Sequence, residues 1–254
     1  LKNSSPVPGW FAAMKSERER NLEACASEFI GTFFLVFTVG LNVLQRAALA
    51  PISVGCMLTA MLFATAGVGG AAHLNPAVTL GFMLGRECGV GTKQALMLVL
   101  GQILGGLGGS YMYAAVLGVT FTLQPGPGFT AKEAFAVEFL FSAVLVFVVL
   151  HVAPRWGKDI SGQYFGLAIG AVVMAAAFAV GHVSGCSLNP ALALGVMSSH
   201  WLHTGTGLYY APLYLLAPLI GGCLASAAHR ALQVGSTDCA VGSMDRGPNV
   251  DVQL

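Results

Sequence analysis

Two stretches of sequence decide the fold: His73-Leu74-Asn75-Pro76-Ala77-Val78 and Ser187-Leu188-Asn189-Pro190-Ala191-Leu192. Each joins an Asn, a strong helix N-cap residue, to a Pro, which suits the first helical position because its missing N–H would be unpaired there. A short apolar run follows each motif, at 76–85 and at 190–199. At about 1.5 Å per residue, a run of ~10 residues reaches roughly 15 Å, half of a ~30 Å hydrocarbon core. We therefore predict two half-helices that enter a membrane without crossing it.

The amino-acid composition excludes most classes of soluble protein. Of the 254 residues, 56% are hydrophobic and only 9% are charged, whereas an ordinary soluble domain carries about 25% charged and roughly 45–50% apolar residues. The net charge of +1 provides no basic field for nucleic acid. We therefore expect an integral membrane protein in a lipid bilayer, and neither a soluble enzyme, a nucleic-acid binder nor a disordered chain.

Six apolar segments are long enough to cross a bilayer, since a spanning helix needs roughly 20 mostly apolar residues. They lie at about 24–44, 51–71, 94–117, 132–153, 162–182 and 208–232. The polar segment 1–22 precedes them, and the polar segment 233–254 follows them as a predicted disordered tail. The first span is expected to serve as its own uncleaved insertion signal, because no small-residue cleavage site follows it.

The chain also repeats itself. The stretch 67–81 recurs as 181–195 at an offset of 114, with seven of fifteen positions identical. A Glu-Phe pair lies near the start of the first span and again near the start of the fourth. Each repeat, at about 23–117 and about 132–232, thus holds three spans and one half-helix. Because three is odd, the second repeat must lie upside-down relative to the first, and the half-helices meet near the midplane from opposite faces.

Lysine and arginine are distributed unequally between the two predicted sides. With six spans, both termini share one side. That side collects ten basic residues: Lys2, Lys15, Arg18, Arg20, Arg86, Lys93, Arg155, Lys158, Arg230 and Arg246. The opposite side holds only Arg46 and Lys132. The positive-inside rule then predicts that both termini are cytoplasmic.

The paired asparagines predict the chemistry of the midplane. Each side-chain carbonyl can cap its own half-helix, which leaves the amide N–H groups free to donate into a lumen. Two facing helix N-termini also place their positive dipole ends at the centre. Such a midplane holds the oxygen of a neutral solute and repels cations, and irregular backbone is tolerated at that depth where it lines a cavity.

At this point the chain resembles the aquaporins, the major intrinsic protein family, over nearly all of residues 23–232. The resemblance rests on the two Asn-Pro-Ala motifs, the Glu-Phe starts of spans one and four, and Gln102 in span three. It implies an all-α integral membrane fold, with six tilted transmembrane helices and two re-entrant half-helices around one pore per subunit, and a homotetramer. The implied midplane residues of the pore are Asn75, Pro76, Ala77, Asn189, Pro190 and Ala191.

Four residues are expected to support the loops of the pore. Glu28 and Glu138 are the only acids well inside the apolar spans. A buried membrane carboxylate is a candidate for a proton relay, but no intramembrane Lys or Arg lies near either residue in the sequence. The resemblance implies instead that both accept hydrogen bonds from the loops that lead into the half-helices. We assign His73 to the packing of its loop, and Gln102 to the structural support of the same pore loops.

The outer filter departs from the family pattern. The resemblance implies an Arg three residues after the second Asn, but Leu192 stands there, and Ala193 replaces the Asp usual in glycerol-conducting members. When the other filter positions of the family are transferred to this sequence without gaps, they fall at Gly55, Ala177 and Cys186. The first two assignments are open to a shift by one residue. These side chains predict a filter that is wide, neutral and poor in hydrogen-bond donors.

We therefore expect a passive channel for water and small uncharged solutes, with glycerol, urea, ammonia and hydrogen peroxide as candidates. Phe121, Phe129 or Trp201 could narrow the mouth from elsewhere. Two alternatives stay open: a largely closed structural or adhesion member of the family, since an apolar constriction can dewet, and a secondary transporter, since inverted repeats with broken helices are common there.

No enzymatic activity, cofactor or metal is expected from the sequence. It contains no Ser/His/Asp set, phosphate loop or metal cluster in a plausible place. The cysteines are scattered without ligand spacing and predict neither disulfides nor metal binding: Cys25, Cys56, Cys88, Cys186, Cys223 and Cys239.

Overall fold

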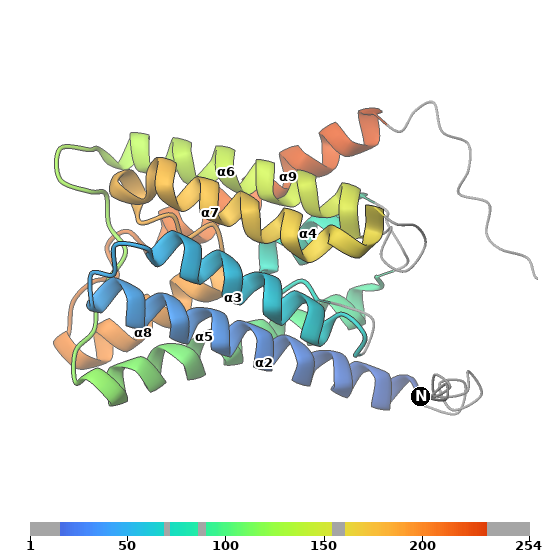
Figure 1. Cartoon of the computed structure of the whole chain (residues 1–254), viewed down its shortest axis with the longest axis horizontal. Coiled ribbons are helices and arrows are strands. Elements are labelled where there is room, and N and C mark those ends of the chain that lie inside the picture. Colours follow the sequence, from blue (N-terminus) through green and yellow to red (C-terminus); the bar gives the residue numbers. More distant parts are fainter. Residues whose placement is uncertain (1–15, 69–71, 86–89, 154–160, 233–254) are drawn as a thin grey trace, which may run out of the picture.

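The computed structural model describes residues 16–68, 72–85, 90–153 and 161–232. Within these ranges the chain forms helices and no strands. The elements are α2 (Glu17–Leu44), α3 (Ala50–Thr65), α4 (Pro76–Gly85), α5 (Thr92–Leu117), α6 (Ala131–Val152), the 3-10 helix η2 (Ser161–Tyr164), α7 (Phe165–Ser184), α8 (Pro190–Thr204) and α9 (Ala211–Leu232). The long helices run side by side along the longest axis of the molecule (Figure 1).

Helix α2 begins earlier than the apolar pattern predicts. The sequence places the start of the first span at 24, whereas the helix begins at Glu17. A capping box fixes this start, because Glu19 N donates to Ser16 Oγ over 3.2 Å and Ser16 N donates to Glu19 Oε2 over 2.7 Å. The first turns are polar, so hydropathy alone misses them. Residues 1–15 and the predicted tail 233–254 lie outside the described residues.

Two other helix ends differ from the predicted segments by five or six residues. The second span is predicted to reach 71, but α3 ends at Thr65 and has 16 residues, about 24 Å at 1.5 Å per residue. Gly67 follows directly after the C-cap residue Ala66, and glycine is a poor helix former. The other five long helices are long and apolar enough to cross a membrane. Half-helix α8 continues past 199 to Thr204, where Gly205 ends it in the left-handed conformation (φ 75°).

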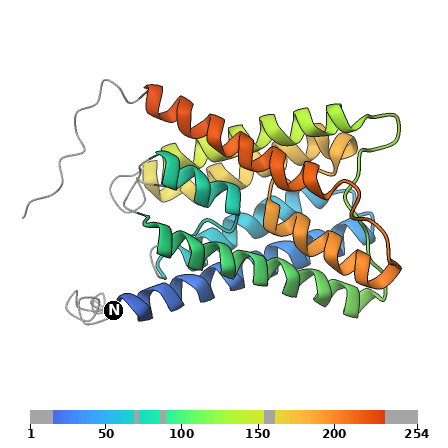
Figure 2. The same ribbon diagram turned by 180° about the vertical axis from the view of Figure 1, so that it is seen from behind.

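The two half-helices enter from opposite ends of the molecule. We call the end where α2 begins and α9 ends the inner end, and the opposite end the outer end. Figures 1 and 2 show α4 at the inner end and α8 at the outer end. Their N-termini both point to the middle of the bundle, as the inverted repeat predicts.

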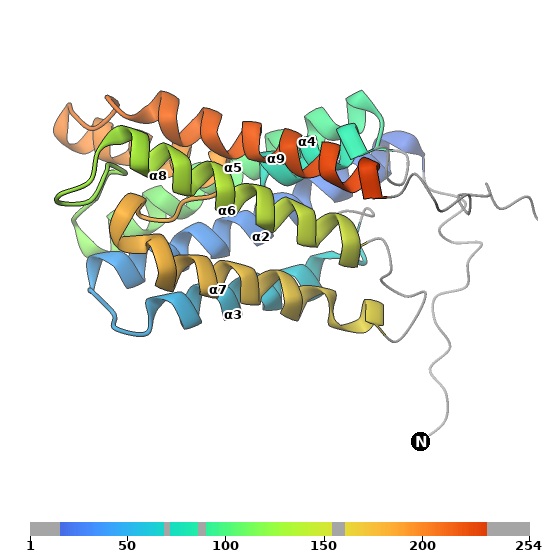
Figure 3. The ribbon, with the colours of Figure 1, turned by 90° about the horizontal axis from the view of Figure 1, so that it is seen from above.

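The packing of the helices repeats in the two halves. Helix α2 packs on α5 as α6 packs on α9, and α3 meets α7 where the halves join. Viewed from above, α3 and α7 lie together along one edge (Figure 3). Each half-helix also packs against the last span of the other repeat: α8 on α5, and α4 on α9. Glycines permit these approaches, because a Cβ on Gly106 would lie 2.3 Å from Ala191 O and one on Gly222 would lie 2.8 Å from Ala77 O.

Charge and exposure agree with a membrane setting. Apolar side chains on the outside of the bundle are exposed, among them Leu96, Leu140 and Leu167. Among the described basic residues, those near the inner end are Arg18, Arg20, Lys93 and Arg230, and those near the outer end are Arg46 and Lys132. The other six basic residues used for the predicted orientation lie outside the described ranges.

Candidate functional site

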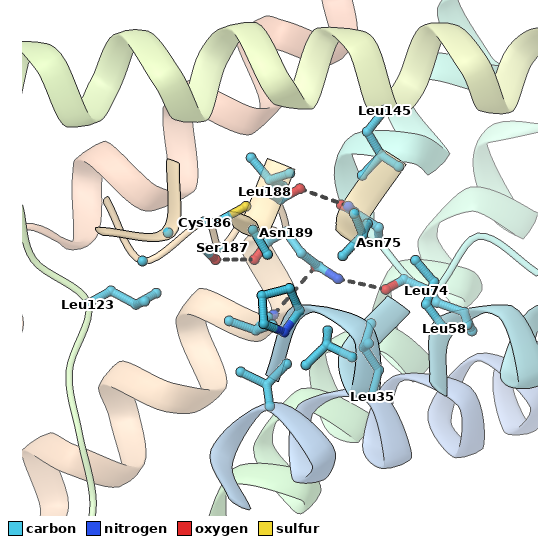
Figure 4. A pocket seen from close by; sticks show the side chains of 18 of the residues that line it. Leu35, Leu58, Leu74, Asn75, Leu123, Leu145, Cys186, Ser187, Leu188 and Asn189 are labelled. Carbon is cyan, nitrogen blue, oxygen red and sulfur yellow. Dashed lines mark hydrogen bonds between the residues drawn. The ribbon is translucent and has the colours of Figure 1, made fainter. Parts of the chain in front are cut away.

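The two asparagines meet at the centre of the bundle and are bonded reciprocally. Asn75 Nδ2 donates to the carbonyl oxygen of Leu188 over 2.8 Å, and Asn189 Nδ2 donates to the carbonyl oxygen of Leu74 over 2.8 Å. Figure 4 shows both bonds beside the cavity. Each asparagine thus fixes the loop that leads to the other, and the two half-helix N-termini are held at a set separation.

Each asparagine also caps its own half-helix. Asn75 Oδ1 accepts from Ala77 N over 2.9 Å, and Asn189 Oδ1 accepts from Ala191 N over 3.0 Å. The sequence predicts amide groups that are wholly free to face a lumen, and this is wrong in one respect. One N–H of each amide is used across the midplane, so each amide has only one other N–H to donate.

The backbone before each asparagine is strained. Leu74, Cys186 and Leu188 have φ of 52°, 52° and 49°, in the left-handed region. For a residue with a Cβ this conformation costs roughly 1–2 kcal/mol. The strain persists because the loops are anchored from outside, and it turns the Leu74 and Leu188 carbonyls toward the opposite asparagine.

Glu28 anchors the first loop. Its carboxylate accepts from His73 N over 2.7 Å and from Leu74 N over 2.6 Å, and Gln102 Nε2 donates to it over 2.7 Å. Gln102 Nε2 also lies 2.9 Å from Thr79 Oγ1, which is 3.0 Å from His73 Nδ1. The His73 ring stacks on a Phe ring of α4 at 4.5 Å. The carboxylate thus carries a structural hydrogen-bond network that links α2, α5 and the loop before α4.

Glu138 anchors the second loop in the same way. It accepts from Ser187 N over 2.9 Å and from Leu188 N over 2.7 Å. The third donor is the Ser184 Oγ, at 2.6 Å, which corresponds to Gln102 as the third donor to Glu28. Tyr214 Oη donates to Ser184 O over 2.6 Å and ties α9 to the same point. The roles of Ser184 and Tyr214 were not predicted, because the first repeat has Gly70 at the position of Ser184 and the repeated pattern therefore gives no signal for it.

A cavity of about 350 Å³ runs beside the asparagines. It extends from Val43 and Ala50 near the outer end, past the midplane, to Leu62 and Val149 toward the inner end. Its lining is mostly aliphatic and contains no Lys, Arg, Asp or Glu among the described residues. The polar residues that line it come from the two loops with their asparagines, from the end of α7 and, at the outer end, from Thr122 and Gln124 of the α5–α6 segment.

Three of the four predicted filter residues line this cavity, and one does not. Ala177, Cys186 and Leu192 all line it. Gly55 instead lies in the crossing of α3 and α7, where an added Cβ would meet Gly170 O at 2.8 Å. Val54, the preceding residue, lines the cavity in its place. The position transferred from the family without gaps is therefore displaced by one residue in span two, from Val54 to Gly55.

The residues predicted to narrow the mouth are placed differently from one another. Phe121 lines the cavity. The Phe129 ring packs edge-on against His182 at 5.5 Å, and Trp201 is 46% exposed; neither lines the cavity. Leu123, which the sequence did not single out, is 5% exposed and does line it. A loop position of this kind carries no periodic signal, which is why sequence reasoning missed it.

The fold and this site together define a membrane channel of six spans and two half-helices. A family model described as "Major intrinsic protein" matches residues 15–229. The chain is 31% identical to aquaporin A of Dictyostelium discoideum, over 81% of this chain and 77% of that protein. It is 26% identical to aquaporin AqpM of Methanothermobacter marburgensis, over 82% of this chain and 96% of that protein.

A solved structure shares the fold. The aquaglyceroporin from Plasmodium falciparum matches with a TM-score of 0.69 at 21% identity, over 84% of this chain and 95% of that chain. The chain belongs to the major intrinsic protein family. It is an integral, multi-pass membrane protein and a passive channel for water and small uncharged solutes.

Proposed function

We propose that this channel passes glycerol-sized neutral solutes as well as water, and that its selectivity is set by an apolar outer filter of Val54, Ala177, Cys186 and Leu192. The observation that carries the proposal is the absence of any charged side chain among the described residues that line the cavity. Leu192 stands where the family pattern implies an Arg, so the fixed charge and the donors of that side chain are missing from the mouth.

We further propose that Asn75 and Asn189 are the donors that a solute oxygen meets at the midplane, with Pro76, Ala77, Pro190 and Ala191 as the first turns of the half-helices. One N–H of each amide faces away from the cross-bond, and the positive ends of two helix dipoles add to it. Cations meet this positive potential and lose their hydration in an aliphatic tube, and both effects oppose their entry.

The apolar filter favours a particular solute class. A solute that crosses an aliphatic constriction gives up hydrogen bonds to water, at a cost that rises with the number of its polar groups. An alkyl face offsets part of that cost, because it loses nothing by leaving water. Glycerol presents such a face, and ammonia and hydrogen peroxide are small enough to pass with few bonds lost. Urea, with polar groups on every side, is expected to pass less readily.

Two features of the assembly also belong to this proposal. The ten-to-two distribution of Lys and Arg supports cytoplasmic termini. Membership of the family supports a homotetramer with one pore in each subunit. The channel domain is then 23–232, with repeats at about 23–117 and 132–232, flanked by cytoplasmic segments.

Stopped-flow light scattering on proteoliposomes tests the function directly. Liposomes that contain the channel should shrink fast in sucrose, and in glycerol they should shrink and then re-swell quickly. Fast shrinkage without faster re-swelling than in empty liposomes would contradict a glycerol-passing filter. Shrinkage no faster than in empty liposomes would instead favour a closed, structural member of the family. Flux that depends on a proton or sodium gradient would favour a transporter.

A further inference from the structure

The segment between α5 and α6 is fastened across the outer mouth. Thr120 Oγ1 lies 3.0 Å from His200 Nδ1, and Thr122 Oγ1 donates to Gly207 O over 2.8 Å. Farther along the segment, Gly126 N donates to Val183 O over 2.8 Å. The segment is thus bonded to α8, to the α8–α9 connection and to the end of α7, and these anchors hold the short stretch 123–125 in place.

This stretch begins with Leu123, whose side chain points into the cavity. It is 5% exposed, although it belongs to a loop, and it extends from the loop toward Cys186 and Ser187 (Figure 4). A Cβ on Gly185 would lie 3.2 Å from Leu123 Cδ2, so the leucine packs on the residue directly before Cys186. Leu123 also shares one apolar cluster with Leu192.

From this geometry we propose that Leu123 is a fifth, specificity-determining residue of the outer filter. It approaches from the loop, whereas the other four come from α3, α7, α8 and the loop before α8. The mouth without the usual Arg is therefore not simply wide, as the sequence predicts, but is narrowed by an aliphatic side chain on a fastened loop. This inference rests on the proposed function, because it concerns the selectivity of the same pore.

The physical effect of Leu123 differs from that of an Arg. An Arg would add donors and a positive charge, whereas a leucine removes volume without offering a hydrogen bond. Water and polar solutes lose hydrogen bonds as they pass it, and the loss is larger for solutes with more polar groups. Leu123 should thus restrict solutes by size and polarity together, and its truncation should relax both.

Mercury block gives a positional test. A mercurial forms a bond to a cysteine sulfur with loss of the thiol proton, and it stops flux where that sulfur lies in the pore. In a Cys186→Ser background, whose residual block is measured first, Leu123→Cys should make water flux mercury-sensitive. The matched control is Phe129→Cys in the same background, on the same loop but outside the cavity lining, and it should stay insensitive. An insensitive Leu123→Cys channel with normal flux would overturn the proposal.

Permeability ratios give a second, independent test. Leu123→Ala should raise glycerol permeability several-fold while water permeability changes less, and it should raise urea permeability most, because urea has the most polar surface. Trp201→Ala truncates an exposed side chain near the same end and should change neither. An unchanged glycerol-to-water ratio in Leu123→Ala would contradict the proposal. Absence of flux in the unsubstituted protein would contradict the proposed function itself, so the two failures are distinguishable.

Discussion

Asn75 donates its side-chain N–H to the backbone carbonyl of Leu188, a residue 113 positions away in the chain. The reciprocal bond from Asn189 reaches Leu74. Each half-helix therefore sets the position of the loop before the other, and the centre of the pore is a joint product of the two repeats. Because one N–H of each side-chain amide is held in this bond, the direction of the other N–H is fixed as well.

Replacing one asparagine by aspartate tests the constraint with almost no change in shape. In Asn189→Asp the acceptor that caps α8 is kept, but the donor to Leu74 O is lost and two oxygens then face each other. We expect a loss of stability of about 1–3 kcal/mol, lower water flux, and a measurable cation conductance because the midplane gains a negative charge. Thermal unfolding in detergent and planar-bilayer recording check these outcomes. A variant as stable and as impermeable to cations as the parent would contradict the role given to the cross-bond.

The buried carboxylates should be intolerant of an amide. Glu138 accepts from three donors, and Glu138→Gln replaces one acceptor oxygen by an NH2 group that faces a donor. We expect a destabilisation of about 3 kcal/mol or more, with loss of assembled channel. Glu133→Gln is the control, because Glu133 is exposed in a capping box that accepts either residue. Equal thermal stability of the two variants would show that the anchors of the loop lie elsewhere.

The one-residue correction in span two separates two neighbouring substitutions. Val54→Leu should keep the fold and reduce glycerol flux, because residue 54 lines the cavity. Gly55→Leu should instead lower stability and yield, because even a Cβ there would meet Met174 Cγ at 2.2 Å. Size-exclusion profiles and flux, measured on both variants, check this pair. A well-folded Gly55→Leu channel with altered solute selectivity would restore Gly55 to the filter.

Leu192→Arg should convert the mouth toward the usual family pattern. The longer side chain takes up space between α8 and the loop that carries Leu123, and it adds donors and a charge. We expect glycerol flux to fall much more than water flux, as followed by osmotic shrinkage and re-swelling of proteoliposomes. An equal loss of both fluxes would argue against a size filter and for simple obstruction or misfolding.

Much of this architecture could be predicted from the sequence because its determinants are local. An Asn-Pro pair followed by an apolar run favours a helix start, and the repeated Glu near the start of spans one and four follows from the same symmetry. The start of α2 at Glu17 was missed since polar turns add nothing to an apolar pattern. The cross-midplane bonds were missed because they join residues of different repeats, which only the folded chain brings together.

The outer filter shows which family positions can be assigned to this sequence from a motif alone and which cannot. Positions close to the second motif, Cys186 and Leu192, were placed on the cavity correctly, because few residues separate them from the asparagine. Gly55 is farther from its motif, and a slip of one residue turns a side chain about 100° around a helix. Leu123 belongs to no helix at all, so its place depends on loop anchors that no periodic pattern encodes.

The exchange of half-helices between repeats has a consequence for biogenesis. Half-helix α4 packs against α9, which is made after it, while α8 packs against α5, which is made before it. The second re-entrant segment can therefore pack on its partner span as soon as it is made, whereas the first cannot complete its packing until α9 has been synthesised. A chain that stops short of α9 would leave α4 without the close contact of Gly222 with Ala77 and without the hydrogen bond from Ser226 to Gly81 O, and we expect it to be a substrate for membrane quality control.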